Sequence, residues 1–542
     1  MTKIVTVEEM RAIESAADAG GLTYAQMMEN AGRAVAEAIV KRVGPVDGKR
    51  IAILVGGGNN GGDGLVAGHY LAEAGALVSA YLASPRPEDD VNLVRLRCHG
   101  MLIANAADDQ RHRVLRNLMS SADIVLDALL GTGFNLPLRG SIQDVLAAAG
   151  KALAERSASP LVVAVDCPSG LDCDSGQIAP ETLRAQLTVT LAAAKIGLLR
   201  FPGATAVGDL VVADIGIPDT QPQLAAVSLE LPQAQTLRCW LPPRPKDAHK
   251  GTFGRAILVA GSVNFPGAAA LAGEAAYRVG AGLVTLAVPA NIQSLIVPRL
   301  PEATWILLPH ELGVIAEEAV PVLQEELGQA EALLLGPGLG QDPTTSGFLA
   351  RLLGAGEGPR GRIGFVPAEG RAAEKHPLPP CVVDADGLKL LARIPEWHQR
   401  LPKPSILTPH PGEMAVLTGQ AKDAIQADRA ATARRWARTW GHVVVLKGAF
   451  TIVAEPSGKA VVLPFATPAL ARAGTGDVLA GAIVGLLAQG VGPFEAAVLG
   501  AYLHGRAGLL AAEELGTTAS VLAGDVGEML SVALAELEGP GE

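Results

Sequence analysis

Short apolar runs that end in glycine-rich or acidic turns constrain this chain more than any other feature. Ile51–Val55 leads into Gly56–Gly64, a helix-compatible segment follows at Leu65–Ala74, and a second apolar run follows at Ala76–Leu82. This order of strand, glycine turn, helix and strand predicts a βαβ unit. The same alternation returns in the second half, from Ala256–Ala260 onward. The chain is therefore predicted to be an α/β protein with ligand sites at the carboxyl ends of its strands.

Length and proline placement predict two domains. A chain of 542 residues is too long for one ordinary hydrophobic core. Asp219–Trp240 mixes proline, glutamine and isolated apolar residues, and further prolines follow directly after it. Because proline interrupts regular structure, we expect a linker at residues 219–240 between domains 1–218 and 241–542.

Charge and cysteine usage exclude several classes of protein. Acidic residues outnumber basic ones by 55 to 44, which argues against a nucleic-acid partner and against a polybasic membrane patch. The five cysteines are scattered and form no CxxC pair, so neither a disulfide framework nor a zinc site is indicated. Met1–Met10 is not a signal peptide, and the longest apolar runs are too short to cross a bilayer. We expect a cytoplasmic protein with no nucleic-acid or membrane partner.

The glycine loop of the first half satisfies GxGxxG but departs from a dehydrogenase fingerprint. The ribose-binding acid expected about twenty residues later is replaced by Ala83–Pro85. The loop instead supplies amides and a carboxylate, and later strands lead into further acids. The side chains expected on this rim are Asn59, Asn60, Asp63, Asp127, Asp166 and Ser169. Oxygen ligands of these types suit a hard cation.

The motifs GGGNNGGDG, DALLGTGF and VDCPSGLD, with Met28–Arg33, resemble the NAD(P)H-hydrate epimerase domain of the YjeF N-terminal type. The resemblance covers residues 1–218 and implies a Rossmann-like parallel sheet. It implies contacts to the hydrated dinucleotide from Asn59, Asn60, Gly61, Gly62, Asp63, Gly131, Thr132, Gly133, Phe134, Asn135, Leu136, Pro137 and Asp166. It also implies a potassium ion held by Asn60, Asp127 and Ser169. We expect Asp166 to perform acid–base work, with Lys195 as a second candidate.

In the second half, Ala473–Gly481 reads as a glycine turn, one acid and an apolar helix. Backbone amides at a helix start are unpaired donors at the positive end of the helix dipole, and small residues let a phosphate approach them. Asp477 is suited to accept a proton beside that phosphate. Taken alone, the pattern also fits a plain helix start with a favourable acid in its first turn.

Five motifs occur in order across residues 241–534: GPGLG, VDAD, TPHPGE, KGAFT and AGTGDVLAG. Together they resemble the ribokinase-like family and, within it, the ADP/ATP-dependent NAD(P)H-hydrate dehydratase. The resemblance implies nucleotide binding by Lys447, Gly448, Ala449, Phe450, Thr451, Gly474, Thr475 and Gly476. It implies that Ala268, Gly340, His410 and Asp477 line the hydrate site. Ala473 stands where the family usually has glycine, which is costly if that position needs a positive φ.

These resemblances predict a bifunctional enzyme that repairs hydrated nicotinamide cofactors. The first domain would interconvert the R and S hydrates. The second would phosphorylate the hydroxyl of the S hydrate, with Asp477 as base and magnesium carried by ADP or ATP, so that phosphate departs and NAD(P)H is restored. We also expect a homo-oligomer. The alternative is a ribokinase-like kinase of a hydroxylated vitamin precursor, with an N-terminal ligand-binding or scaffold domain.

Overall fold

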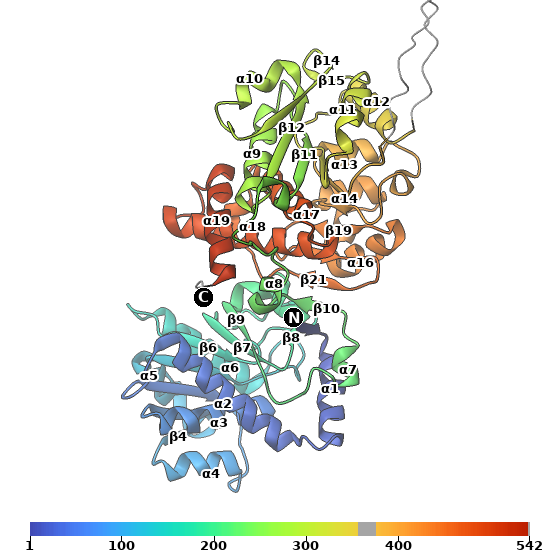
Figure 1. The fold of residues 1–542 in the computed structure, drawn as a ribbon. Coiled ribbons are helices and arrows are strands. Elements are labelled where there is room, and N and C mark those ends of the chain that lie inside the picture. Colours follow the sequence, from blue (N-terminus) through green and yellow to red (C-terminus); the bar gives the residue numbers. More distant parts are fainter. Residues whose placement is uncertain (356–375, 540–542) are drawn as a thin grey trace, which may run out of the picture. The chain divides into compact units, whose positions relative to one another are not determined.

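The computed structural model describes residues 1–355 and 376–539, which form two compact units (Figure 1). One unit spans Thr2–Leu229, and the other begins at Glu230. The predicted linker segment contains three short elements, α7 (Pro222–Ala225), β10 (Leu229–Leu231) and α8 (Ala234–Arg238). The boundary between the units therefore falls inside a segment with regular structure.

The first unit is built on a parallel sheet. Its strands lie in the order β4-β3-β2-β5-β6-β7-β9. The strands are β2 (Arg50–Val55), β3 (Leu77–Leu82), β4 (Leu102–Asn105), β5 (Ile124–Ala128), β6 (Leu161–Val165), β7 (Leu187–Leu191) and β9 (Asp209–Ala213). The order reverses between β2 and β5, which is where open α/β sheets bind ligands. A short parallel pair, β1 (Thr2–Val5) and β8 (Ala194–Lys195), places Val5 opposite Lys195.

Helices cover both faces of this sheet (Figure 1). Alternate residues of β2 enter different cores, because successive strand side chains point to opposite faces. Ile53 packs on the face of α1, α2 and α3, and Leu54 on the face of α5 and α6. The helices are α1 (Val7–Ala19), α2 (Tyr24–Val43), α3 (Asn59–Glu73), α4 (Val91–Cys98), α5 (Arg113–Ser121) and α6 (Gly140–Ala154). The α/β class predicted for this half is confirmed.

Helix α3 begins at Asn59, six residues before the start predicted at Leu65. The glycines that suggested a loop instead let the helix lie directly on the sheet. A Cβ added to Gly64 would lie 2.4 Å from the Cβ of Ala128, and one added to Gly61 would lie 2.1 Å from the carbonyl oxygen of Gly56. The motif's asparagines and aspartate therefore stand in the first turns of a helix.

The second unit has a longer sheet whose strands run in the order β13-β12-β11-β16-β17-β18-β19-β20-β21. The strands are β11 (Arg255–Val259), β12 (Leu283–Pro289), β13 (Thr304–Leu308), β16 (Ala332–Leu335), β17 (Cys381–Val383), β18 (Ile406–Leu407), β19 (Val443–Leu446), β20 (Ile452–Ala454) and β21 (Ala460–Val462). Pairing is parallel from β13 to β19 and antiparallel from β19 to β21. A separate hairpin joins β14 (His310–Glu311) to β15 (Val314–Ile315).

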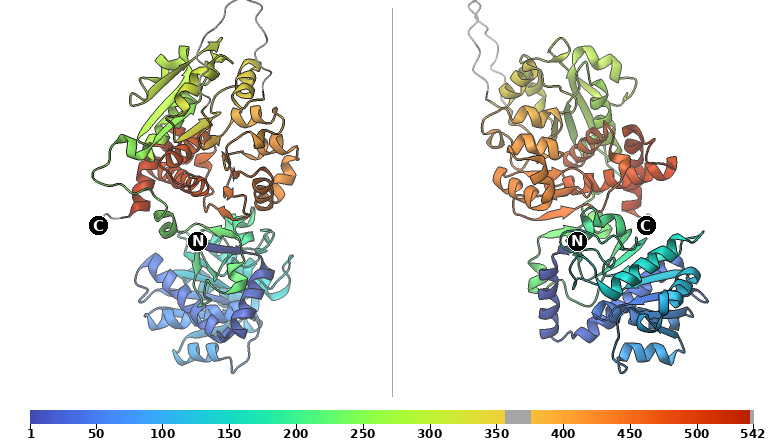
Figure 2. Two further views of the ribbon diagram at one scale, coloured as in Figure 1. Left: turned by 45° about the vertical axis from the view of Figure 1, so that its right-hand side comes forward. Right: turned by 180° about the vertical axis from the view of Figure 1, so that it is seen from behind.

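Helix α17 belongs to the group of C-terminal helices that are coloured red in Figure 2. Nearly all of its residues are buried. An apolar surface all round a helix requires packing partners on every side. Those partners include α9, α18 and α19. The helices are α9 (Pro266–Arg278), α10 (Gln293–Ile296), α11 (Ala319–Leu327), α12 (Pro343–Leu352), α13 (Asp386–Leu391), α14 (Pro411–Thr418), α15 (Lys422–Ala427), α16 (Arg429–Trp440), α17 (Thr475–Ala488), α18 (Pro493–Leu515) and α19 (Ala523–Glu538). Within the described residues, no helix is long and apolar enough to cross a membrane.

Two candidate active sites at strand ends

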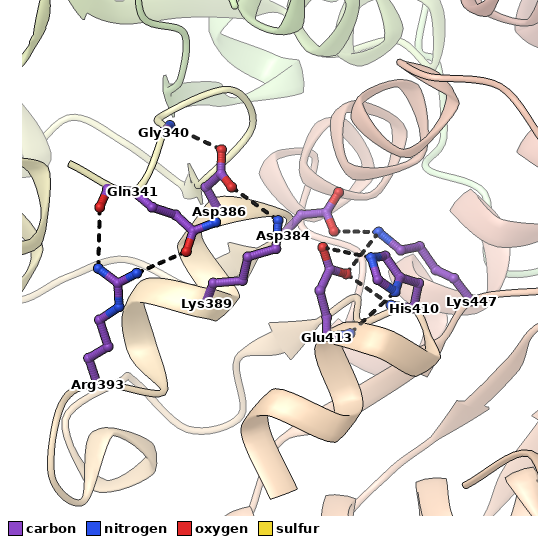
Figure 3. Close-up of polar contacts among 9 residues, drawn as sticks. All are labelled: Gly340, Gln341, Asp384, Asp386, Lys389, Arg393, His410, Glu413 and Lys447. Atoms are coloured by element: carbon purple, nitrogen blue, oxygen red, sulfur yellow. Dashed lines mark hydrogen bonds and ion pairs between the residues drawn. The ribbon is translucent and has the colours of Figure 1, made fainter. Parts of the chain in front are cut away.

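A buried ion pair stands at the carboxyl ends of two central strands in the second unit (Figure 3). Asp384 directly follows β17 and Lys447 directly follows β19, and Oδ1 of Asp384 lies 2.6 Å from Nζ of Lys447. Glu413 Oε2 lies 3.8 Å from the same nitrogen. Burial lowers the pKa of Lys447, but the two carboxylates more than offset this and the net pKa is raised. Lys447 is therefore a mostly buried cation, not the solvated lysine common at strand ends.

Asp477 lies in the first turn of α17 beside this pair. A Cβ added to neighbouring Gly476 would lie 3.5 Å from Nζ of Lys447 and 3.7 Å from Oδ2 of Asp384. Burial, followed by the charge of Asp384, raises the pKa of Asp477 to about 7, and Lys447 acts in the opposite direction. A carboxyl group with such a pKa accepts protons efficiently near neutral pH.

The turn before α17 explains how alanine is accommodated at position 473. Gly474 is the residue with positive φ, at 91°, and it caps the helix. Ala473 is not among the non-glycine residues with positive φ, so the predicted backbone cost does not arise. The Thr475 amide points at the carbonyl of Arg472, at 3.5 Å, and its hydroxyl donates to the same carbonyl at 2.9 Å. The turn is thus fixed by its own backbone and side-chain contacts.

His410 caps helix α14 with its ring. Nδ1 accepts hydrogen bonds from the amides of Gly412, at 2.9 Å, and Glu413, at 3.2 Å. Glu413 returns the contact by accepting from the amide of His410 at 3.0 Å (Figure 3). Burial and the charge of Lys447 lower the pKa of His410. The ring is therefore neutral and carries its proton on Nε2, which lies 3.4 Å from Oε1 of Glu413.

The other residues predicted to line the hydrate site lie on the adjoining wall. The Gly340 amide donates to Oδ2 of Asp386 at 3.0 Å, and Lys389 holds the other carboxylate oxygen at 3.1 Å. Ala268 packs under the same turn, because a Cβ on Gly338 would lie only 2.8 Å from the Cβ of Ala268. Asp386 also contributes to the raised pKa of Asp477, which connects this wall to the helix start.

The predicted nucleotide-binding segment, Lys447–Thr451, is held by Arg429, a residue that the sequence motifs did not indicate. Arg429 Nη2 donates to the carbonyls of Leu446 and Lys447, at 2.9 and 3.1 Å, and Nη1 contacts the carbonyl of Ala449. Burial lowers the pKa of Arg429 to about 10. Gly448 and Phe450 adopt positive φ, and Thr451 Oγ1 donates to the carbonyl of Gly448. The segment is therefore a shaped turn and not a simple strand extension.

In the first unit, the two acid–base candidates form one buried ion pair. Lys195 Nζ lies 2.5 Å from Oδ1 of Asp166, which also accepts from the Leu191 amide at 3.1 Å and from the Thr190 hydroxyl at 3.2 Å. Burial lowers the pKa of Lys195, but Asp166 more than offsets this effect. Asp166 follows β6 with a φ of 63°, an unusual backbone conformation for a residue with a side chain.

Two further carboxyl groups face this pair. Burial, then the charges of Asp166 and Glu14, raise the pKa of Asp63 well above its usual range. Burial also raises the pKa of Glu14 in α1, against the charge of Lys195. The site thus combines a carboxyl group whose pKa is raised, Asp63, with a carboxylate that is paired with a lysine, Asp166. Glu14 belongs to none of the motifs quoted above, and only the fold brings α1 to this site.

Two of the three predicted potassium ligands, Asn60 and Ser169, contact the Leu130 carbonyl, and the third, Asp127, contacts Ser169. Ser169 Oγ lies 2.5 Å from Oδ1 of Asp127, and the Leu130 amide donates to Ser169 Oγ at 2.9 Å. Asn60 Nδ2 donates to the Leu130 carbonyl at 2.9 Å. In the part of the chain that the structure describes, the buried Oδ1 of Asn60 has no hydrogen-bond partner. A buried oxygen without a donor, beside carboxylate and hydroxyl oxygens, fits a cation.

The segment 131–137 adjoins these ligands. A Cβ added to Gly131 would lie 3.4 Å from the Cβ of Asn60. Four residues of the segment, Phe134 to Pro137, line a cavity of about 450 Å³. Thr132 is half-buried, and Gly133 and Asn59 are exposed. Gly61 and Gly62 are buried in α3. The predicted contact residues therefore gather around the start of α3 and the loop after β5.

Comparison with known proteins finds two families, one matching each of the two compact units. Residues 256–532 match the family described as NAD(P)H-hydrate dehydratase, and residues 24–197 match YjeF-related protein N-terminus. A bifunctional NAD(P)H-hydrate repair enzyme of Moorella thermoacetica is 40% identical over 520 residues, covering 94% of this chain and 92% of its own. The Escherichia coli K12 enzyme of the same description is 34% identical over 513 residues, covering 94% and 89%.

A solved structure is also similar. The ADP/ATP-dependent NAD(P)H-hydrate dehydratase of Bacillus subtilis, co-crystallised with ATP and Mg²⁺, is 33% identical and covers 58% of this chain and all of its own, with a TM-score of 0.47. The fold and the two sites define a two-domain α/β enzyme with an N-terminal parallel-sheet unit and a C-terminal ribokinase-like unit. The chain belongs to the bifunctional NAD(P)H-hydrate repair enzymes.

Proposed function

We propose that the second unit dehydrates the S form of NADHX or NADPHX with ADP or ATP, and that the first unit interconverts the R and S forms. The observation that supports dehydration most strongly is the position of Asp477. This carboxyl group has a pKa of about 7, lies in the first turn of a buried helix and adjoins the Lys447–Asp384 ion pair.

In the proposed dehydration, Asp477 takes the proton of the substrate hydroxyl, and the oxygen then attacks the terminal phosphate of the nucleotide. The bond between that phosphate and the bridging oxygen breaks, and AMP leaves from ADP or ADP leaves from ATP. The amides of Gly474–Gly476, at the positive end of α17, stabilise the charge that develops on phosphate. Lys447 lies beside that helix start and adds a positive charge. The ring nitrogen then expels inorganic phosphate as the carbon–oxygen bond breaks, and loss of a proton from the adjacent ring carbon restores the reduced nicotinamide.

For the remaining residues of this unit, we propose the roles that the family motifs imply. Ala268, Gly340 and His410 would line the hydrate site, and residues 447–451 would bind the nucleotide. Magnesium would enter with the nucleotide, and the oxygen-rich surroundings of Asp384 and Asp477 suit such a hard cation. The neutral ring of His410 offers its Nε2 proton to a bound oxygen.

For the first unit, we propose that Asp63 and Asp166 transfer protons in the epimerisation, with Asp63 as the donor and Asp166 as the acceptor. Inverting the hydrated carbon requires that one of its bonds break and re-form, so a proton must be delivered and later recovered. Burial raises the pKa of Asp63, which favours its protonated form, and Asp166 is paired with Lys195. Two carboxyl groups whose environments differ in this way can supply both directions of proton transfer.

We further propose that Asn60, Asp127 and Ser169 hold a potassium ion, with the Leu130 carbonyl as an additional oxygen. The unpartnered Asn60 Oδ1 supports this assignment. A bound cation would fix the loop after β5 against α3.

We propose domain limits of 1–218 and 241–542, a homo-oligomeric assembly and a cytoplasmic location, where the free state of all five cysteines would be maintained.

Replacement of Asp477 tests the dehydration mechanism. Asp477→Asn removes the base but keeps the shape of the side chain, so we expect dehydration to fall by roughly 10²- to 10⁴-fold. The assay supplies the S hydrate with ADP or ATP and follows the recovery of dihydronicotinamide absorbance. Epimerisation by the same full-length variant should stay within twofold of wild type.

Asp423→Asn provides the matched control, because Asp423 is an exposed acid in the first turn of α15. It should leave both reactions unchanged. Normal dehydration by Asp477→Asn would remove this carboxylate from the mechanism. Product analysis addresses the vitamin-precursor alternative, because a kinase would release a phosphorylated product instead of inorganic phosphate and NAD(P)H.

A further inference from the structure

The first unit contains a cavity that none of the predicted contact residues lines. It has a volume of about 640 Å³ and lies at the carboxyl ends of β3 and β4. Its lining includes Leu82, Ser84, Arg86 and Asn105. The volume is within the range of about 300–1,000 Å³ that is usual for small-molecule sites.

The position of this cavity follows from the strand order. In the sheet β4-β3-β2-β5-β6-β7, the strands β2, β3 and β4 form one half and β5, β6 and β7 form the other. A dinucleotide lies across the point where the order reverses, with one nucleotide over each half. Asp127 and Asp166, which mark the proposed chemistry, belong to the half formed by β5 and β6. The other half ends at the cavity.

The cavity adjoins the glycine loop after β2. A Cβ on Gly57 would lie 3.4 Å from the Cβ of Ser84. Arg86 lines the cavity and donates from Nη1 to the carbonyls of Gly56, at 2.7 Å, and Gly58, at 3.0 Å. Its guanidinium is also paired with Asp90 at 2.8 Å and is largely buried. Arg86 therefore fixes the loop after β3 against the glycine loop and places the cavity next to that loop.

The lining suits a purine nucleoside. Leu82, Ala83 and Leu93 give a buried apolar wall on which a flat base can lie. Asn105 and Asp108 stand at the rim as an amide and a carboxylate, the groups that bind ribose hydroxyls. No acid follows β3 directly, so the ribose contacts would come from β4 and the turn after it.

We propose that this cavity binds the adenosine half of the hydrated dinucleotide, while the hydrated nicotinamide ring lies near Asp63 and Asp166. The proposal rests on the epimerase function proposed above and adds the subsite that holds the non-reacting end of the substrate. Binding energy from this end would lower KM for the dinucleotide hydrate without participating in bond breaking.

The test compares the dinucleotide hydrate with the hydrate of reduced nicotinamide mononucleotide, which lacks adenosine. Full-length wild type should epimerise both, with KM at least tenfold higher for the mononucleotide. Ser84→Trp and Asn105→Trp fill the cavity from two different walls. Each should raise KM for the dinucleotide about tenfold or more and leave the mononucleotide parameters within twofold. Ser157→Trp is the control, because Ser157 is exposed and precedes the amino end of β6, whereas the cavity lies at the carboxyl ends of β3 and β4.

The outcomes separate this proposal from the function on which it depends. If wild type interconverts neither hydrate, the epimerase function itself fails. If wild type epimerises both hydrates with equal KM, or if the filled variants keep the wild-type KM for the dinucleotide, the adenosine assignment is overturned. Equal loss on both substrates in both filled variants would also overturn it, because the cavity would then support the whole site and not one end of the ligand.

Discussion

At the scale of single residues, the second active site depends on how carboxyl groups share a cation. Lys447 is 2.6 Å from Asp384 and 3.8 Å from Glu413, so its charge is committed mainly to Asp384. Asp477 is left in a buried place where a neighbouring negative charge opposes its ionisation. The raised pKa of Asp477 therefore follows from the arrangement of its neighbours, and it suits a proton acceptor near neutral pH.

The pH dependence of dehydration tests this environment. Asp477 must be ionised to accept a proton, and its pKa is about 7. We expect kcat/KM for dehydration to fall about tenfold for each pH unit below about 7, because the protonated fraction grows as pH falls. An ordinary aspartate would keep the rate constant down to about pH 4. A profile that stays flat to pH 5 would contradict the proposed role.

At the scale of elements, the turn at the start of α17 is tightly packed. Gly474 has a φ of 91°, and a Cβ there would lie 2.8 Å from Leu271 Cδ1 and 2.9 Å from the Cβ of Ala523. Ala473, one residue earlier, lies outside the positive-φ region. Position 473 thus accommodates a Cβ, whereas position 474 does not.

This difference predicts that one of two small substitutions in this turn is harmful and the other is tolerated. Gly474→Ala should lower the thermal stability of the second unit, because a left-handed backbone costs about 1–2 kcal/mol for a residue with a Cβ and the methyl group also clashes. Its kcat/KM for dehydration should fall at least tenfold as the amides shift. Ala473→Gly should change either quantity little. The measurements are thermal unfolding and dehydration kinetics, and a neutral Gly474→Ala would show that the turn is not strained.

In the first unit, the loop after β5 and the start of α3 are joined by Asn60 and the Leu130 carbonyl. If a potassium ion completes this junction, exchange into a buffer without potassium should lower epimerisation, and added potassium should restore it. Asn60→Ala removes the unpartnered oxygen and should abolish the response to potassium. Dehydration of the S hydrate by the same samples should not change. Epimerisation that is indifferent to potassium in wild type would refute the site.

The sequence predicted the strands and the residues at their ends better than it predicted which side chains contact each other. Short apolar runs such as Val443–Leu446 gave strand positions, because a buried parallel strand needs continuous apolar residues. The start of α3 was placed too late, since glycine usually breaks helices but here permits close packing. Asp384, Arg429 and Glu14 received no role, because a side chain's partners depend on contacts between distant segments.

At the scale of the whole molecule, one chain carries a site for each of two consecutive reactions. The proposed dehydratase consumes only the S hydrate, so a mixture of hydrates is fully repaired only if the R form is converted. Nothing in this arrangement requires that the intermediate pass directly between the sites. It requires only that both activities be present in one solution.

Separate inactivation of the two sites tests this relationship. With a mixture of R and S hydrates and excess nucleotide, wild type should restore NAD(P)H from the whole mixture. Asp166→Asn removes the carboxylate paired with Lys195, so recovery should stop at the S fraction. Adding Asp477→Asn, which keeps the epimerase site, should carry the reaction to completion. Absorbance measured to its plateau gives the result. Complete recovery by Asp166→Asn alone would show that the first unit does not supply the second.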